Sequence, residues 1–228
     1  MTSTRTVLVV AAHSDDETLG CGATLHRHSE AGDRVVGIHL TNGIGARETA
    51  DAGATRVRTA AAEEAAQILG FEWIAAGNFP DNQMDGVELL KVVKFVEQAK
   101  RKCEPDLVYT HHGGDLNVDH RIAFQATLTA FRPQPSEKRV EIRSFEVPSS
   151  TEWSHRTIGD EFRPNLYVDV SEHWEQKARG LEAYAEEMRP APHSRSVRGL
   201  EALATRRGAE AGVDKAEAFE LVRRIVRG

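Results

Sequence analysis

Short apolar runs alternate along the chain with longer stretches in which apolar residues recur at helical spacing. The first run, residues 7–11, is continuously aliphatic, which is typical of a strand buried on both faces of a parallel sheet. In contrast, Val87, Leu90, Val93 and Val96 recur every three residues and predict one face of a helix. By these criteria, strands are expected at residues 7–11, 34–40, 73–76, 106–110, 142–147 and 166–170. Helices are expected at residues 14–31, 54–69, 87–102, 120–131, 172–188 and 215–226.

This alternation of strand and helix predicts an α/β fold. We expect a Rossmann-like, doubly wound, mostly parallel sheet with helices on both faces and a less regular C-terminal extension. The chain is short enough for a single domain, residues 1–228, in which residues 1–132 form the core and residues 133–228 the extension. Ligands of such sheets bind at the carboxyl ends of the strands, where His13, Thr41, Asp81 and His111 would gather.

The composition narrows the kinds of function that the chain can serve. A net charge of −6 argues against a dedicated nucleic-acid-binding protein, because such domains usually carry a basic excess. Cys21 and Cys103 are too few and too far apart for a disulfide framework or a thiolate zinc cluster. Any metal would therefore be held by carboxylates and by some of the ten histidines. The apolar stretch at residues 7–12 is too short for a membrane span and too acidic downstream for a signal peptide, so we expect a cytoplasmic protein without a membrane partner.

Two clusters of polar residues follow predicted strands. In the first cluster, His13 and Asp16 can ligate one divalent metal ion while Asp15 remains free to act as a base. The alternative is a helix N-cap, since acidic residues commonly stabilise helix starts. The second cluster, residues 111–120, holds three histidines and two aspartates. Because both clusters follow strands, a shared metal site explains them better than two separate structural roles.

The residues of both clusters resemble the motifs of a known family. Residues 13–17, His-Ser-Asp-Asp-Glu, resemble the His-Pro-Asp-Asp-Glu motif of the zinc-dependent N-deacetylases of the PIG-L and LmbE-like family. Residues 117–121, Asn-Val-Asp-His-Arg, resemble that family's second motif, His-x-Asp-His-Arg. The resemblance runs from about residue 7 to residue 121 and continues into residues 187–190 and the loop that follows.

The resemblance implies the roles of individual residues. His13, Asp16 and His120 would bind Zn²⁺, and Asp15 would be the general base that accepts a proton from the attacking water. Asp119 would orient a ligand or the water without binding the metal itself.

This chain departs from the family pattern at the residue expected to act as the general acid. Asn117 occupies the position where the family commonly has a histidine, and an amide cannot donate a proton at a useful pKa, although it can hydrogen-bond an oxyanion. We therefore expect His193, in a loop bounded by prolines, to be the acid, which would make the C-terminal extension part of the pocket. His111 and His112 are the next candidates for the general acid. The alternative for His193 is a surface residue with no role.

The remaining candidates are substrate contacts. Arg58 and Asp81 can bind sugar hydroxyls, and Asn117 and His112 would lie near the pocket, with Arg47 a weaker candidate. Arg58 and Asp81 can equally be an exposed helix charge and a turn residue. The arginines between residues 189 and 207 would suit a nucleotide-linked sugar or, equally, a solvated face or a subunit contact.

The resemblance implies a zinc-dependent hydrolase that removes the N-acetyl group from an N-acetylglucosamine-type amino sugar. That sugar could be free, nucleotide-linked or part of a glycoconjugate or natural-product intermediate. A metal-dependent phosphohydrolase using Asp15 and Asp16 is one alternative, although histidine ligands favour zinc over magnesium. A catalytically inactive sugar-binding member of the fold, suggested by Asn117, is another. The expected partner is a small molecule, and a homo-oligomer remains open because members of the family are often oligomeric.

Overall fold

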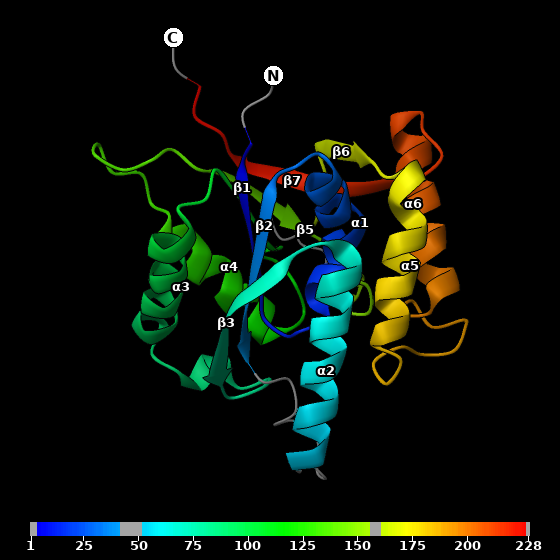
Figure 1. Ribbon diagram of the computed structural model, residues 1–228, viewed down its shortest axis with the longest axis horizontal. Coiled ribbons are helices and arrows are strands. Elements are labelled where there is room, and N and C mark those ends of the chain that lie inside the picture. Colours follow the sequence, from blue (N-terminus) through cyan, green and yellow to red (C-terminus); the bar gives the residue numbers. More distant parts are fainter. Residues whose placement is uncertain (1–3, 42–51, 156–160, 227–228) are drawn as a thin grey trace.

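The computed structural model describes residues 4–41, 52–155 and 161–226, which form one seven-stranded sheet in the order β3-β2-β1-β4-β5-β7-β6 (Figure 1). The strands are β1 (Thr6–Ala11), β2 (Arg34–Thr41), β3 (Glu72–Phe79), β4 (Leu107–His111), β5 (Glu141–Phe145), β6 (Leu166–Asp169) and β7 (Ala216–Arg223). The helices are α1 (Asp16–Glu30), α2 (Ala52–Leu69), α3 (Leu89–Cys103), α4 (Val118–Ala130), α5 (Trp174–Ala183) and α6 (Val197–Ala211). Three short 3₁₀ helices are η1 (Met84–Gly86), η2 (Thr151–Trp153) and η3 (Ser171–His173).

The predicted α/β fold is confirmed. Strands β1 to β5 are parallel, and α3 and α4 cover one face of the sheet while α1, α2, α5 and α6 cover the other (Figure 1). Successive side chains of β1 point to opposite faces of the sheet: Leu8 and Val10 pack on the α3 side, and Val7 and Val9 pack on the α1 side. No helix in the described part of the chain is both long and apolar enough to span a membrane.

The C-terminal part differs from the prediction. The helix expected at residues 215–226 is instead the strand β7, which pairs antiparallel with both β5 and β6. Alanine and glutamate in this segment favour a helix locally, but pairing with β5 satisfies the backbone and buries Phe219 against Tyr109. The helix expected at residues 172–188 is shorter, and α6 is a helix that the pattern did not predict. Residues after 132 therefore complete the same sheet.

A buried ion pair supports a kink in α1, the helix that carries Asp16. Cys21 has non-helical backbone angles, so the regular hydrogen bonding of α1 is interrupted there. The N–H group of Thr24 donates to the carboxylate of Glu217 in β7, at 2.7 Å. Lys177 of α5 donates to the carbonyl of Leu19 at 2.9 Å and forms an ion pair with Glu217 at 2.6 Å. Strand β7 and helix α5 thus hold α1 in place from the C-terminal part of the chain.

Candidate active site

The two polar clusters meet at the carboxyl ends of the central strands. Residues 13–16 follow β1, residues 112–120 follow β4, and β1 pairs directly with β4. The sheet reverses its strand order between these two strands, which is where open α/β sheets place their ligand sites. Clusters more than ninety residues apart in sequence are therefore side by side.

His13, Asp16 and His120 form a group that can hold a metal ion. Each offers one ligand atom, the three atoms lie within 4.8 Å of one another, and all three residues are buried. Asp16 Oδ2 lies 3.1 Å from His13 Nδ1, and Asp16 Oδ1 lies 3.3 Å from His120 Nε2. Two imidazoles and one carboxylate are the ligand set of many hydrolytic zinc sites, which leave a fourth position for water or substrate.

The surroundings of the two imidazoles fit a bound metal. His13 Nε2 lies 3.1 Å from carboxylate oxygens of both Asp119 and Asp81, and His120 Nδ1 lies 3.1 Å from Asp115. Each ring therefore has Asp16 at one nitrogen and a further carboxylate at the other. Carboxylates behind the ligating imidazoles are a regular feature of metal sites, where they set ring orientation and tautomer. The donor set present thus fits a Zn²⁺ ion.

The electrostatics of the group also favour a cation. Burial lowers the pKa of His120, but the charge of Asp16 and the contact with Asp115 outweigh it and raise the pKa to about 9. Burial raises the pKa of Asp16, yet the surrounding histidines, His120 first, hold it well below its usual value. The carboxylates thus draw protons onto the rings. A metal ion would displace those protons, because only neutral imidazole ligates.

Asp115 is a site residue to which the sequence assigned no role. It accepts hydrogen bonds from the hydroxyls of Ser150 and Thr151, in the segment after β5, and from the backbone of Asn117. Burial raises its pKa, but the contact with His120 leads the opposing effects, and the pKa falls to about 2. Asp115 is therefore an ionised, fixed carboxylate behind His120. The sequence places Asp115 in the second cluster but gives no sign of Ser150 and Thr151, which lie about 35 residues away.

Asp15 lies between two arginines. Arg58 Nη2 is 3.1 Å from Asp15 Oδ1, and Arg195 Nη1 is 3.4 Å from Asp15 Oδ2. Burial raises the pKa of Asp15, Arg58 lowers it, and the net pKa lies above the usual value. Arg58 also contacts Glu187 at 2.6 Å and donates to Ser14, so this predicted substrate contact is held by protein groups.

The loop that carries His193 reaches this site through Arg195. His193 Nδ1 accepts the backbone N–H of Arg195 at 3.0 Å, and its ring packs edge-on against Trp153 with centroids 5.6 Å apart. No contact joins His193 to the metal-ligand group within the described ranges. The contact of Arg195 with Asp15 was not predicted, because the sequence shows it only as one of several arginines.

Asn117 and Asp119 organise the start of α4. The side-chain oxygen of Asn117 caps α4 by accepting the N–H of Asp119 at 2.8 Å, and its amide donates to Asn82 at 2.9 Å. The carboxylate of Asp119 accepts the N–H groups of Asn82 and Met84 while it faces His13. This is the arrangement that a positioning role for Asp119 requires.

Three further candidates from the sequence are His111, His112 and Arg47. His111 is fully buried, stacks on His120 at 4.0 Å and accepts the N–H of Ala12; burial lowers the pKa of His111 to about 3. It is therefore neutral at physiological pH and does not suit a proton donor. His112 is also buried, and its Nδ1 lies 2.9 Å from Glu220 of β7. Arg47 lies outside the described residues.

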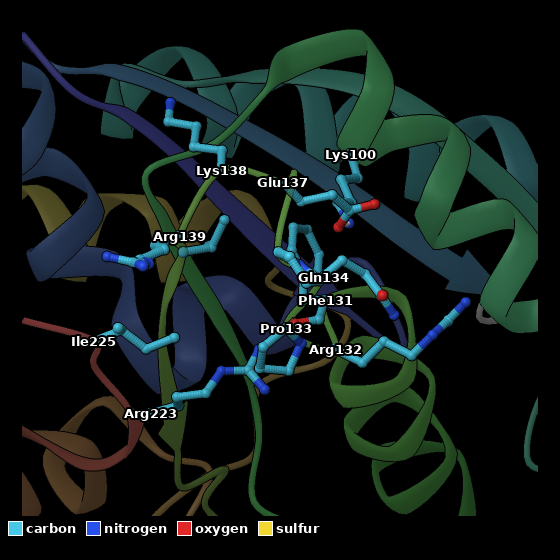
Figure 2. Close-up of a pocket in the computed structure, with 12 residues that line it drawn as sticks. Lys100, Phe131, Arg132, Pro133, Gln134, Glu137, Lys138, Arg139, Arg223 and Ile225 are labelled. Carbon is cyan, nitrogen blue, oxygen red and sulfur yellow. Dashed lines mark hydrogen bonds and ion pairs between the residues drawn. The ribbon is translucent and has the colours of Figure 1, made fainter.

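A separate cavity of about 300 Å³ lies away from this site (Figure 2). It is formed by the loop between α4 and β5 together with Lys100, Arg223 and Ile225. This loop leads into the amino end of β5, whereas the clusters lie at the carboxyl ends of β1 and β4. None of the predicted site residues lines this cavity.

The fold and the site define an α/β protein with a buried group of residues, His13, Asp16 and His120, that can hold a metal ion. Residues 8–131 match the family model described as PIG-L: GlcNAc-PI de-N-acetylase. Because this match spans more than half of the chain, the protein belongs to the PIG-L family.

Curated relatives include two deacetylases and a hydratase. The uncharacterized deacetylase YaiS of Escherichia coli K12 is 28% identical over 74% of this chain and 83% of its own length. The 4-oxalmesaconate hydratase of Pseudomonas putida KT2440 is 27% identical over 81% and 74% of the two chains. The diacetylchitobiose deacetylase of Thermococcus kodakarensis is 27% identical over 78% and 68%. Among solved structures, the conserved protein TT1542 of Thermus thermophilus shares the fold, with a TM-score of 0.77, 24% identity and coverage of 99% and 98%.

Proposed function

We propose that this protein is a zinc-dependent N-deacetylase of amino sugars. One observation carries the proposal: His13, Asp16 and His120 converge with a carboxylate behind each imidazole, and Asp15 stands next to the group in sequence without being one of its members. This is the arrangement that metal-assisted amide hydrolysis needs. Membership of the PIG-L family and the two deacetylase relatives support it.

The chemistry divides between the metal and Asp15. A Zn²⁺ ion held by His13, Asp16 and His120 would polarise the acetamide carbonyl and acidify water. Asp15 accepts the proton of the attacking water, and the burial that raises its pKa makes it a better base than an exposed aspartate. Arg58 and Arg195 contact the two oxygens of Asp15, and their charges oppose the rise in its pKa that burial causes.

The departing amine must be protonated when the C–N bond breaks. We assign this step to His193, because the loop that contains it is joined to Asp15 through Arg195. Asn117 does not take this role, because an amide cannot donate a proton at a useful pKa. Its side chain already caps α4 and donates to Asn82.

The proposed substrate is a small amino sugar. Diacetylchitobiose is the substrate in the name of one relative, and polar side chains surround the proposed centre. Arg58, Asp81, Asn117 and His112 are the proposed sugar contacts. Arg58 and Asp81 already face Asp15 and His13, so substrate would bind beside these pairs. A cytoplasmic location and a homo-oligomeric state remain predictions.

Hydration of an unsaturated dicarboxylate is a second candidate. A relative of similar identity is a hydratase, and the guanidinium groups of Arg58 and Arg195 could bind substrate carboxylates. The phosphohydrolase alternative is weaker, because two imidazole nitrogens are poor ligands for Mg²⁺.

The test is a substrate panel assayed on metal-free and zinc-loaded protein. The panel contains N-acetylglucosamine, diacetylchitobiose, a nucleotide-linked N-acetylglucosamine, an unsaturated dicarboxylate and a phosphate monoester. We expect acetate release from at least one amino sugar, dependent on about one equivalent of zinc. Loss of the dicarboxylate's ultraviolet absorbance without acetate release would identify a hydratase, and phosphate release a phosphohydrolase. Zinc-loaded protein that releases no acetate from any of these amino sugars would overturn the proposal.

A further inference from the structure

A second group of metal-ligating residues lies at the other end of α1. His26 and Glu30 occupy its last turns, and His173 lies in η3, just before α5. One ligand atom from each lies within 4.8 Å of the others. Ten residues separate Asp16 from His26, so the two groups are about 15 Å apart along the helix. This group therefore shares no ligand with the proposed catalytic centre.

We propose that His26, Glu30 and His173 form a second binding site for a divalent transition-metal ion, which links the end of α1 to the start of α5. The distances fit such an ion. Glu30 Oε1 lies 3.4 Å from His26 Nε2, and Glu30 Oε2 lies 3.2 Å from His173 Nδ1. Tetrahedral zinc with bonds of about 2.0–2.1 Å places its ligand atoms about 3.4 Å apart.

The hydrogen-bonding state of the imidazoles points to an absent partner. Both ring nitrogens of His26 and Nδ1 of His173 are buried and have no hydrogen-bond partner among the described residues. An unsatisfied buried polar atom costs about 1–3 kcal/mol. Although Glu30 lies within reach of both rings, neither contact is a hydrogen bond. A metal ion between the three side chains would satisfy one nitrogen of each ring and the carboxylate together.

The donor atoms of the group determine which kind of ion it favours. The group offers two imidazole rings and one carboxylate as donors. The two rings meet edge to face at 72° with centroids 5.7 Å apart, and one nitrogen of each lies within 4.8 Å of the other. Glu30 is more than half exposed, which leaves room for water ligands. Two nitrogen donors and one oxygen donor favour Zn²⁺, Ni²⁺ or Cu²⁺ over Mg²⁺ or Ca²⁺.

The test is the stoichiometry of Ni²⁺ and Zn²⁺ binding to chelator-treated full-length protein, measured by calorimetry and elemental analysis. We expect two equivalents for the wild type and one for His173→Ala, with deacetylase activity retained. Asp16→Ala should lose the other equivalent and keep this one. Because the site bridges two elements, metal should also raise the melting temperature of Asp16→Ala but not that of Asp16→Ala/His173→Ala.

Two further variants keep the result interpretable. Glu30→Gln removes an exposed ligand without disturbing the core and should weaken the second equivalent at least tenfold, which covers the case in which His173→Ala does not fold. His155→Ala removes a histidine outside both groups and should leave both equivalents intact. A wild-type stoichiometry that both His173→Ala and Glu30→Gln leave unchanged would overturn the proposal.

Discussion

Asp115 Oδ1 lies 3.1 Å from His120 Nδ1, while Asp16 faces the other nitrogen of the same ring. Ser150 and Thr151 hold this carboxylate by donating their hydroxyl protons to it. A loop of the C-terminal extension thereby fixes the carboxylate that faces His120, a proposed metal ligand from the core. The proposed metal centre consequently involves both parts of the chain.

Replacing Asp115 should weaken metal binding. In Asp115→Asn, His120 loses the negative charge that orients it and strengthens it as a donor, and we expect zinc affinity to fall about 10- to 100-fold. Competition with a fluorescent chelator measures the change. Ser150→Ala is the matched control and should have a smaller effect, because Thr151 still holds the carboxylate. Equal affinities for Asp115→Asn and wild type would show that Asp115 does not support the ligand.

Replacing Asp15 should separate catalysis from metal binding. Asp15→Asn keeps the shape of the side chain but removes the base, so kcat should fall about 10²- to 10⁴-fold while the zinc content stays the same. Steady-state kinetics and elemental analysis of the same preparation give both values. If the variant instead loses zinc, Asp15 is a ligand and its assignment as base is wrong.

Breaking the buried ion pair at the kink of α1 should destabilise the protein. Glu217→Gln leaves the Lys177 ammonium buried without its counter-charge, and we expect the free energy of unfolding to fall by about 3 kcal/mol. Urea denaturation measures the change. The double variant Lys177→Met/Glu217→Leu removes both charges and should be more stable than Glu217→Gln alone. A double variant that is no more stable would contradict this explanation.

His28 should make stability depend on pH. Its Nδ1 lies 2.7 Å from Asp33 and its Nε2 lies 3.0 Å from the Tyr109 hydroxyl, and burial lowers its pKa although Asp33 opposes this. The unfolded chain takes up a proton near pH 6.5, whereas the folded protein resists it to a lower pH. Stability is therefore complete above about pH 6.5 and falls as the pH drops below it.

The measurement is the free energy of unfolding of wild type and His28→Gln at pH 8 and pH 5.5. The wild type should lose more stability on acidification than the variant, which has no group to titrate at this position. Other histidines titrate equally in both proteins, so the difference isolates His28. An identical pH dependence would refute the assignment.

The parallel half of the fold was predictable because its signals are local. The continuous aliphatic run of β1 and the helical period of α3 each arise within one element. The segment that became β7 carries no such signal: its residues suit a helix, and pairing with β5 and β6 makes it a strand. Long-range pairing thus overrode local preference at the C-terminal end.

The candidate site likewise has one part that the sequence predicted and one part that it did not. Parallel strands place their carboxyl ends at one edge, so the sequence alone was enough to expect His13, Asp16 and His120 near each other. The contacts of Ser150 and Thr151 with Asp115, and the position of Asp15 between Arg58 and Arg195, join residues that are from 35 to 180 positions apart in the chain. No pattern within a window of sequence encodes such contacts.

The sequence by itself determined the α/β core and the order of its motifs, and it predicted His13, Asp16 and His120 as metal ligands, because each of these signals lies within one element or one short motif. Only the tertiary structure decided which carboxylate stands behind each imidazole, that β7 completes the sheet, and that His26 and His173 share Glu30. The physical reason is that hydrogen bonding, burial and charge at each of these places depend on segments that meet only in the folded protein.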